Sequence, residues 1–471
     1  MEFPENTAAE RRGFWSRLQP QRVFLALALP FGLAVLVANP PYQAPDENDH
    51  HYRAFQVSDG AFVSTKQDGS AGGNLPLLVH SSTNMGDIPF HSENKMTRER
   101  FREKWERPWV DWSTEKRVFV GFPHTVVYPP WAYLPQSLAI GVGRFFHVGP
   151  LGLMYLARLA AFVVAIGLGF AALRAVPVFR WSCLVMLLAP MSLYLMGSVA
   201  PDGLLIGCAF LLAGILTRYG TGAAGAPDGW AQAGLLGFAA FLGATKLVYL
   251  PLVLLVPIFV LPRIAGWRER AAFGAAFGLI CLVPLWVWAR VVAEVYAVGR
   301  TDVRIDPTEQ GHYVMGDPVG FAKLMAWSLW EEGNGIYRWF VGTLGWGDTV
   351  MPDWFYGAYG WGLAACLLAE SAEGHRVRWW QRALIVVAAV ATVGMICGAQ
   401  YATWNALGSR ELIEGLSGRY FIPVAAFLIV GFPSLGRLKA PTIYAPLVGT
   451  VVATTSAVVC LAAVVARYYL P

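Results

Sequence analysis

The sequence predicts an all-α polytopic membrane protein, a bundle of about eleven (roughly 10–13) transmembrane helices with two large polar loops. Three observations support this fold class. Hydrophobic residues make up 56% of the 471 residues and charged residues only 14%, whereas soluble domains carry about 25% charged residues. The apolar residues gather in runs about as long as a bilayer requires. Most arginines stand in short hinges between those runs, where positive charge sets membrane topology.

A membrane-crossing helix needs about 17–25 mainly apolar residues. A twelfth candidate at Tyr128–Phe146 is doubtful, because it opens with a Pro pair and ends in Arg-Phe-Phe-His. Eleven other runs approach the required length: Arg22–Ala38, Leu151–Leu173, Trp181–Ala200, Gly203–Leu216, Trp230–Ala244, Leu247–Leu261, Ala271–Ala297, Trp354–Leu368, Arg382–Thr403, Tyr420–Leu435 and Thr442–Ala466.

The distribution of positive charge predicts the orientation. If Tyr128–Phe146 lies in the interface, the hinges on the N-terminal side hold more Arg and Lys than the opposite side, whereas this asymmetry largely vanishes if the segment crosses. The positive-inside rule therefore favours eleven crossings, an N-terminus in the cytoplasm and a C-terminus outside. Both large loops then face outward. The predicted regions are a cytoplasmic N-terminus (1–21), a first transmembrane helix (22–38), an outer loop with interfacial helices (39–150), a transmembrane bundle (151–297), a second outer loop (298–353) and C-terminal transmembrane helices (354–471).

Charge and cysteine content exclude several classes. The net charge of +5 is carried by the hinges and does not indicate a nucleic-acid partner; the expected partner is the lipid bilayer. All six cysteines fall inside apolar runs, with neither a disulfide framework nor a metal-binding spacing. The first apolar run lacks a small-residue cleavage site, so we interpret it as a retained anchor.

The densest polar cluster follows the first apolar run, in the stretch PPYQAPDENDHHYR. Its Pro-Asp pair indicates a helix start with Asp46 as the N-cap. Glu47, His50 and Arg53 then recur at three-residue spacing and would lie near one face. Asp46 and Glu47 emerge close to the bilayer surface, where a carboxylate can act as a general base or hold a cation. A solvated helix start stabilised by local charge pairing is the alternative.

Two isolated charges lie beside later apolar runs. Asp202 ends a long, almost uncharged stretch, where an acidic group is costly unless it is paired or functional, although an Asp-Gly turn or helix cap also explains it. Lys246 stands in a tight hinge on the outer side, so it either meets an anionic lipid phosphate or snorkels to the interface. Arg158 lies within a predicted span, and we interpret it as structural.

Two short motifs complete the candidate residues. In LGWGDTVMP, Trp346 and Asp348 suit a turn that stacks on a sugar ring and accepts its hydroxyls, or an interfacial aromatic anchor. In GRYFIP, Arg419 and Tyr420 stand where a span begins. A guanidinium there can bind a phosphate bidentately, or it can anchor the helix at the headgroups.

In their order along the chain, these stretches resemble a large family of bacterial polytopic proteins catalogued as domain of unknown function 2142 and grouped with the GT-C glycosyltransferases. The ordered set covers nearly the whole chain and is more specific than any one stretch. The matching stretches are PPYQAPDENDHHYR after the first run, YPPWAYLPQ at Tyr128, SVAPDG at Ser198, TK at Thr245, LGWGDTVMP at Leu344 and GRYFIP at Gly418.

The resemblance implies a GT-C fold with a catalytic carboxylate in the first outer loop, a second Asp at a later outer turn and a prenyl-phosphate sugar donor. Asp46 and Asp202 match the two carboxylate positions. Similar enzymes place a Pro pair ahead of an interfacial helix, and some carry a basic residue before it. This chain has Tyr128 there, so phosphate binding must come from elsewhere, with Lys246 and Arg419 as candidates.

The sequence therefore predicts a glycosyltransferase on the periplasmic face of a bacterial inner (cytoplasmic) membrane. It would transfer a sugar from a polyprenyl-phosphate donor to a glycan or lipid-linked acceptor, with inversion. Asp46 would deprotonate the acceptor, and Glu47 or Asp202 would position it or share that role. Cationic side chains would neutralise the departing phosphate. The donor phosphate-binding residues are Lys246, Arg419 and Tyr420, and the substrate-binding residues are His50, Arg53, Tyr128, Trp346 and Asp348.

This interpretation requires no cofactor, although a divalent cation at Asp46 and Asp202 stays open. Two other classes remain as alternatives: a transporter or flippase of lipid-linked saccharides, and a non-catalytic scaffold of a polysaccharide assembly complex. Transporters usually place polar groups near the bilayer midplane and often contain internal repeats. This sequence shows no repeat and concentrates its polar groups at one surface.

Overall fold

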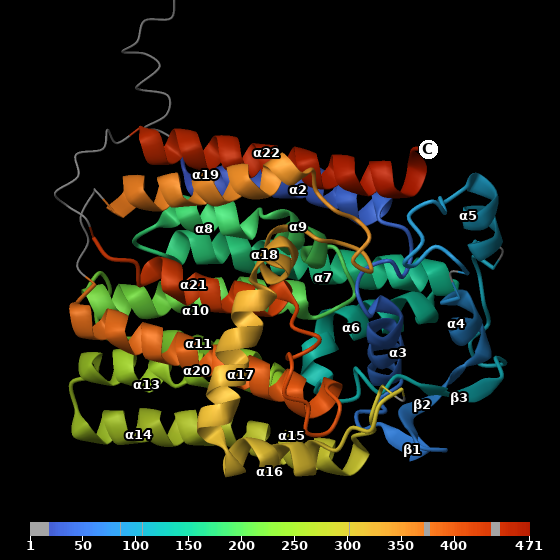
Figure 1. Cartoon of the computed structure of the whole chain (residues 1–471), viewed down its shortest axis with the longest axis horizontal. Helices are drawn as coiled ribbons and strands as arrows, with labels where there is room; N and C mark the ends of the chain where they lie inside the picture. Colours follow the sequence, from blue (N-terminus) through green and yellow to red (C-terminus); the bar gives the residue numbers. More distant parts are fainter. Residues whose placement is uncertain (1–17, 85, 106, 301, 372–376, 435–442) are drawn as a thin grey trace, which may run out of the picture.

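The computed structural model describes residues 18–84, 86–105, 107–300, 302–371, 377–434 and 443–471. Most of the predicted cytoplasmic N-terminus (1–21) therefore lies outside the described residues. The described part is mainly helical, with one small antiparallel sheet. Long helices run side by side in a bundle, and the elements of the first loop gather at one end of it (Figure 1).

The helices of the bundle come from the predicted apolar runs. They are α2 (Pro20–Ala38), α7 (Pro150–Ala175), α8 (Arg180–Leu187), α9 (Pro190–Met196), α10 (Asp202–Thr221), α11 (Gly229–Thr245), η2 (Leu247–Tyr249), α12 (Leu250–Val253), α13 (Leu255–Val260), η3 (Leu261–Arg263), α14 (Trp267–Phe277), η4 (Gly278–Leu282), α15 (Val283–Val295), α19 (Asp353–Ser371), α20 (Trp379–Trp404), η5 (Gly418–Phe421), α21 (Ile422–Val430) and α22 (Tyr444–Tyr469).

Six helical segments of the described chain are long and apolar enough to cross a bilayer, so the protein is a multi-pass membrane protein in contact with lipid. The other predicted crossings fall on helices that are shorter or less apolar, and the number eleven stays a prediction. The six segments are Pro20–Ala38, Pro150–Ala175, Asp202–Thr221, Trp267–Val295, Trp379–Trp404 and Tyr444–Tyr469.

The centre of the bundle is closely packed around α2, α7 and α10, where nearly every side chain of α10 is buried. Small residues let α2 and α7 approach each other. A Cβ added to Gly32 would lie 2.5 Å from the ring of Phe162, and one added to Gly169 would lie 2.6 Å from the ring of Phe24. Such glycines are typical of helix interfaces in membranes, where close van der Waals packing drives association.

The two loops have structure of their own. The first loop contains a sheet that the sequence did not predict, with strand order β1-β2-β3 and both pairs antiparallel. Its elements are α3 (Glu47–Ser58), β1 (Thr65–Gln67), β2 (Ser70–Pro76), α4 (Leu77–Ser82), α5 (Arg98–Lys104), β3 (Arg117–Gly121), η1 (Pro130–Tyr133) and α6 (Leu134–Phe145). Those of the second loop are α16 (Pro307–Gly316), α17 (Pro318–Glu331) and α18 (Gly333–Val341).

The doubtful segment Tyr128–Phe146 forms η1 and the twelve-residue helix α6. A helix of twelve residues rises about 18 Å, which is too short to cross a bilayer. One side of α6 packs on α3 and α7, while Leu138, Val142 and Phe145 remain exposed on the other. An exposed apolar face on a short helix is what an interfacial helix requires, in agreement with the prediction that this segment does not cross.

The first loop and the C-terminus lie at the same end of the bundle, which we call the loop end, while α17 of the second loop crosses over the middle of the bundle in this view (Figure 1). The backbone N–H of Met96 in the first loop donates to the carbonyl of Tyr468 near the C-terminus, at 2.8 Å. The indole of Trp346, from the second loop, donates to the carbonyl of Tyr42 in the first at 3.4 Å. These contacts join the two loops and the C-terminus, and the side of the membrane on which they lie stays a prediction.

Candidate functional site

The site begins where α3 starts. Asp46 occupies the N-cap position of α3 as predicted, but its side chain caps no backbone N–H. Its φ of 57° is left-handed, a strained conformation for a non-glycine residue that the surrounding structure must enforce. The carboxylate turns instead to Arg419, whose Nη2 donates to Oδ2 at 2.9 Å. The Asp46 side chain keeps 37% of its surface exposed, so it is open to a ligand.

A second ion pair joins two later turns of the chain. Asp202 is the first residue of α10, and it makes no capping bond. Its Oδ1 instead accepts from Lys246 Nζ at 2.6 Å, with both side chains nearly buried. The ammonium of Lys246 also lies 5.5 Å from the ring centroid of Tyr128 and 4.8 Å from that of Tyr420. These aromatic faces stabilise the buried cation.

His50 links the two ion pairs. Its buried ring lies 5.4 Å from that of Tyr128, and its Nδ1 is 2.7 Å from the hydroxyl of Tyr133. Both Asp46 and Asp202 act on it electrostatically. The structure thus brings together most of the predicted site residues from five distant parts of the sequence. We call this set the ion-pair cluster, and it consists of Asp46, His50, Tyr128, Asp202, Lys246, Arg419 and Tyr420.

The electrostatics of the cluster favour an ionised carboxylate beside a neutral imidazole. Burial alone would raise the pKa of Asp46, but the charge and hydrogen bond of Arg419, together with His50 and His124, outweigh it and hold that pKa below its ordinary value. Burial lowers the pKa of His50 to about 4, so its ring is neutral near pH 7. Burial likewise raises the pKa of Tyr128 to about 12.

Arg419 carries hydrogen-bonding capacity that its known partners do not use. Its Nη2 reaches Asp46 and, at 3.4 Å, the hydroxyl of Tyr420. Within the described part of the chain, Nε and Nη1 are buried and have no acceptor, and the side chain is only 9% exposed. A buried donor without an acceptor costs about 1–3 kcal/mol. The unused edge of the guanidinium therefore suits an incoming anion, which phosphate matches bidentately.

Glu47 points away from the ion-pair cluster into the protein. It forms a fully buried ion pair with Arg158, whose Nε and Nη2 donate to its two oxygens at 2.8 and 2.5 Å. The same guanidinium donates to the carbonyls of Leu36, Asn39 and Pro40. Arg158 is structural, as the sequence interpretation held, and its pairing commits Glu47 to the same role of fixing the start of the first loop.

Arg53 is also fully buried. Its guanidinium donates to the backbone carbonyls of Phe62, at 2.8 Å, and Tyr128, at 3.2 Å, and it also bonds the side-chain oxygen of Gln56. Arg53 therefore holds Tyr128 in place from behind. The structure leaves it no surface for direct contact with a substrate.

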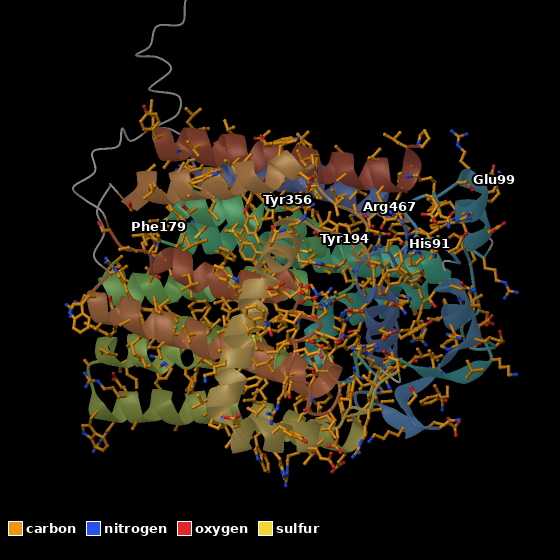
Figure 2. All side chains as sticks on the ribbon, in the orientation of Figure 1. His91, Glu99, Phe179, Tyr194, Tyr356 and Arg467 are labelled. Carbon is orange, nitrogen blue, oxygen red and sulfur yellow. The ribbon has the colours of Figure 1, made fainter. Side chains whose placement is uncertain are left out.

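Trp346 and Asp348 lie apart from the ion-pair cluster, in a joint between the second loop and the C-terminus. Asp348 accepts from Nε and Nη2 of Arg467 at 3.1 and 2.7 Å, and both side chains are buried. Arg467 also donates to the carbonyl of His91 at 2.9 Å, and Figure 2 shows these two residues close together. Trp346 packs its ring on that of Phe90, 5.3 Å away. Both side chains are thus committed to holding the loops together.

Three residues near the ion-pair cluster were not predicted as site residues from the sequence. Asp49 is buried, and burial, reinforced by the charge of Asp46, raises its pKa to about 7. Tyr133 bonds His50, and Tyr249 donates to the backbone carbonyl of Tyr420 at 3.1 Å. The spacing of Asp49 three residues after Asp46 was available as a signal, whereas the tyrosines gave none.

Among the described residues, no group of three or more His, Cys, Asp or Glu side chains is arranged to hold a metal ion. Asp46 and Asp202 each already have a cationic side chain as partner. Such a pair can neutralise an anionic ligand or stabilise developing negative charge without a metal, because the donors are fixed in advance.

A bundle of membrane-crossing helices with paired charges at one end defines a multi-pass membrane protein with a candidate site at its loop end. The chain belongs to the family described as "Predicted membrane protein (DUF2142)", whose sequence model matches residues 29–428. That match covers the whole ion-pair cluster and both loops. No curated protein and no solved structure matches the chain.

Proposed function

We propose that the protein is a membrane glycosyltransferase that moves a sugar from a polyprenyl-phosphate donor to a glycan or lipid-linked acceptor, with inversion. The proposal places about eleven crossings in a bacterial inner membrane, with the loop end on the periplasmic face and a GT-C-like arrangement. The observation that carries it is the partly exposed carboxylate of Asp46 held against the half-used guanidinium of Arg419.

In the proposed reaction the acceptor hydroxyl attacks the anomeric carbon while the bond from that carbon to the phosphate oxygen breaks. The hydroxyl proton passes to Asp46, and the prenyl phosphate leaves with the bonding electron pair. Negative charge grows on the phosphate as it departs, and Arg419 stabilises it through Nε and Nη1. When phosphate draws on the guanidinium, less positive charge acts on Asp46, whose basicity rises as the proton arrives.

The other members of the ion-pair cluster have supporting roles in this proposal. Lys246 adds a second positive charge near the donor, balanced by Asp202, whose charge also acts on His50. The neutral ring of His50 and the hydroxyl of Tyr420 offer hydrogen bonds to sugar hydroxyls. Glu47, Arg53, Trp346 and Asp348, predicted as catalytic or substrate-binding, hold the scaffold instead, given the contacts described above. No cofactor is part of the proposal.

The test is transfer by the purified full chain, offered a panel of polyprenyl-phosphate sugars with a mixture of glycan acceptors in detergent. The expected result is consumption of one donor and release of prenyl phosphate in equal amounts with glycosidic product. A parallel experiment in sealed liposomes separates the transporter alternative. Movement of an intact labelled lipid-linked saccharide across the bilayer, without cleavage of its phosphate bond, would replace the transferase proposal.

A further inference from the structure

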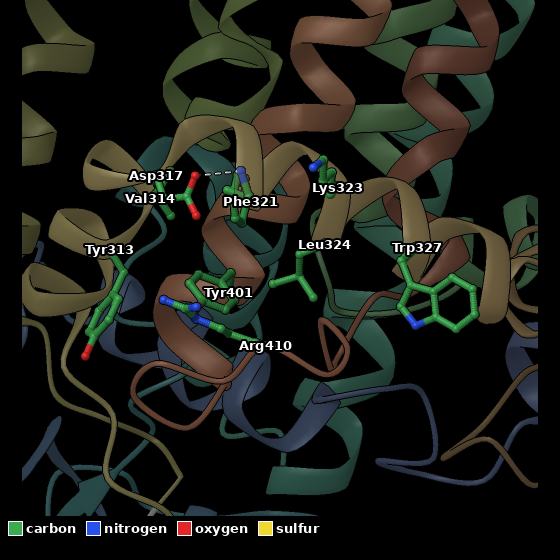
Figure 3. A pocket seen from close by; sticks show the side chains of 10 residues that line it. Tyr313, Val314, Asp317, Phe321, Lys323, Leu324, Trp327, Tyr401 and Arg410 are labelled. Carbon is green, nitrogen blue, oxygen red and sulfur yellow. Dashed lines mark hydrogen bonds between the residues drawn. The ribbon is translucent and has the colours of Figure 1, made fainter.

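A groove of about 330 Å³ lies away from the ion-pair cluster, between the second loop and the end of α20. In Figure 3, Tyr313 and Trp327 stand at its two sides with Leu324, Tyr401 and Arg410 between them. Its volume falls at the lower end of the range of ligand pockets, and its lining of aromatic and aliphatic side chains with a few charged groups is typical of them.

Two cations of this groove have no carboxylate partner among the described residues. Lys323 of α17 and Arg410 of the following turn both line it. The neighbouring ion pairs engage Arg300, Arg304 and Arg338 instead. The carboxylate of Asp317, which also lines the groove, accepts from the backbone N–H of Gly320 at 2.8 Å and caps α17. The groove thus presents two positive charges against the one carboxylate that caps α17, and this excess of positive charge suits an anionic group.

The surface around the groove exposes several large apolar side chains. Met315, Val319 and the groove residue Trp327 are all exposed on the same pair of helices. Exposed Trp and apolar side chains of this kind are typical of the membrane–water interface. An anion that reaches Lys323 and Arg410 there has apolar surface beside it, as the phosphate headgroup of a lipid has.

The groove is tied mechanically to the ion-pair cluster. Gln310 on α16 donates to the carbonyl of Ala406 and accepts from the N–H of Gly408, both at 3.0 Å. Ser328 on α17 accepts from the N–H of Ile413 at 2.9 Å. These bonds fasten the turn after α20, and that turn continues to Arg419.

The far end of α20 reaches the neighbourhood of the catalytic carboxylate. The ring of Trp404, one turn beyond the groove residue Tyr401, lies 5.7 Å from that of His124, and His124 acts electrostatically on Asp46. The end of α20 therefore lies between the groove and the surroundings of Asp46.

We propose that this groove binds the phosphate headgroup of a lipid-linked acceptor, through Lys323 and Arg410. The inference rests on the proposed transferase function and extends it, since the protein then holds two lipid phosphates, the donor's at Arg419 and the acceptor's in the groove. Trp327 and Tyr313 flank the first atoms of the prenyl chain or the first sugar.

The experiment counts binding sites on the purified full chain with farnesyl diphosphate as the probe, in a neutral detergent, by equilibrium titration. The wild type binds two equivalents per chain. The double variant Lys323→Gln/Arg410→Gln loses one site, weakened at least tenfold, and Trp327→Ala weakens the same site. Arg419→Gln loses the other.

The matched controls make the same kinds of substitution at residues that do not line the groove. Trp330→Ala removes an even more exposed indole, 81% against 54% for Trp327, from the same helix. Arg304→Gln removes an exposed guanidinium from the same loop. Both controls retain two sites.

Other numbers of binding sites distinguish the groove proposal from the proposed function. A single site that only Arg419→Gln removes overturns the groove proposal and leaves the proposed function in place. A single site that only the groove variants remove supports the groove and contradicts the donor assignment. Displacement of the probe from the groove by an equal concentration of phosphatidylglycerol would make it a general phospholipid site and overturn the acceptor assignment.

Discussion

Arg419→Lys keeps the positive charge of the candidate site but removes the planar fork of donors, so it separates phosphate recognition from simple charge. In the structure Nη2 is bonded to Asp46 at 2.9 Å, and Nε and Nη1 remain buried without an acceptor in the described chain. A lysine ammonium at this position would be drawn to Asp46. It could not also present two parallel N–H groups to a phosphate.

The magnitude follows from the bonds that are lost. A charge-assisted hydrogen bond contributes about 1.5–3 kcal/mol, and each 1.4 kcal/mol corresponds to about a tenfold change in affinity. Loss of one phosphate bond therefore weakens donor binding by roughly ten- to a hundredfold. Arg419→Gln, which also removes the charge, weakens it further and raises the pKa of Asp46, because Arg419 is the largest of the groups that lower that pKa.

The assay is equilibrium binding of a polyprenyl monophosphate to purified protein, compared at equal amounts of folded chain. Arg338→Lys is the control, because Arg338 also pairs with one aspartate at the loop end, Asp353 at 2.8 Å, on the exposed second loop. We expect Arg338→Lys to be nearly silent. If Arg419→Lys were equally silent, Arg419 would be a headgroup anchor and its assignment to the donor phosphate would be refuted.

Three further predictions concern the scaffold, pH and topology. Glu47→Gln leaves Arg158 buried without its counter-charge, so it should lower the free energy of unfolding by about 3–5 kcal/mol in chemical denaturation. The control, Glu309→Gln in an exposed ion pair, should change that free energy by less than about 1 kcal/mol. Burial raises the pKa of Asp49 to about 7 in the folded chain, so between about pH 4 and 7 the folded chain keeps a proton that the unfolded chain loses, and stability falls as pH rises through this window. Asp49→Asn should remove this part of the fall in melting temperature. A melting temperature with the same pH dependence in Asp49→Asn would contradict the buried carboxyl. Cysteines introduced at Lys66 and Thr308 should react with an impermeant thiol reagent added outside cells, and a cysteine at Ala223 should not. The native cysteines are all buried, so they should give little background labelling. Labelling of all three introduced cysteines from one side would contradict eleven crossings.

The sequence predicted the helical class and the apolar membrane-spanning segments because both depend on local composition. Apolar runs of bilayer length became helices, and the short segment after Tyr128 became an interfacial-type helix because its Pro pair and charged end limit its length. The sheet of the first loop was not predictable in the same way. Strand β2 reads Ser-Ala-Gly-Gly-Asn-Leu-Pro, without the alternation of apolar and polar residues that marks a strand. Its pairing with β3 bridges a long gap in the chain.

The candidate site was predictable as a set of residues but not as a set of partners. Asp46, Asp202, Lys246 and Arg419 each looked unusual because charge beside an apolar run is costly. Which carboxylate meets which cation depends on how α3, α10, α11 and η5 pack, and that information is tertiary. The same holds for Arg53. Its three-residue spacing from His50 was read correctly, but only the packing of Tyr128 against it shows that the guanidinium is buried.

The most direct test of the central claim is single-turnover transfer from a radiolabelled polyprenyl-phosphate sugar by wild type and Asp46→Asn. Asp68→Asn, an exposed carboxylate of the same loop, is the matched control. Loss of a general base costs roughly 10²–10⁴ in rate, so we predict that Asp46→Asn, compared at equal amounts of folded chain, still binds the donor but forms product at least a hundredfold more slowly. Asp68→Asn should turn over normally. Transfer by Asp46→Asn at the wild-type rate would contradict the assignment of the ion-pair cluster as the catalytic centre.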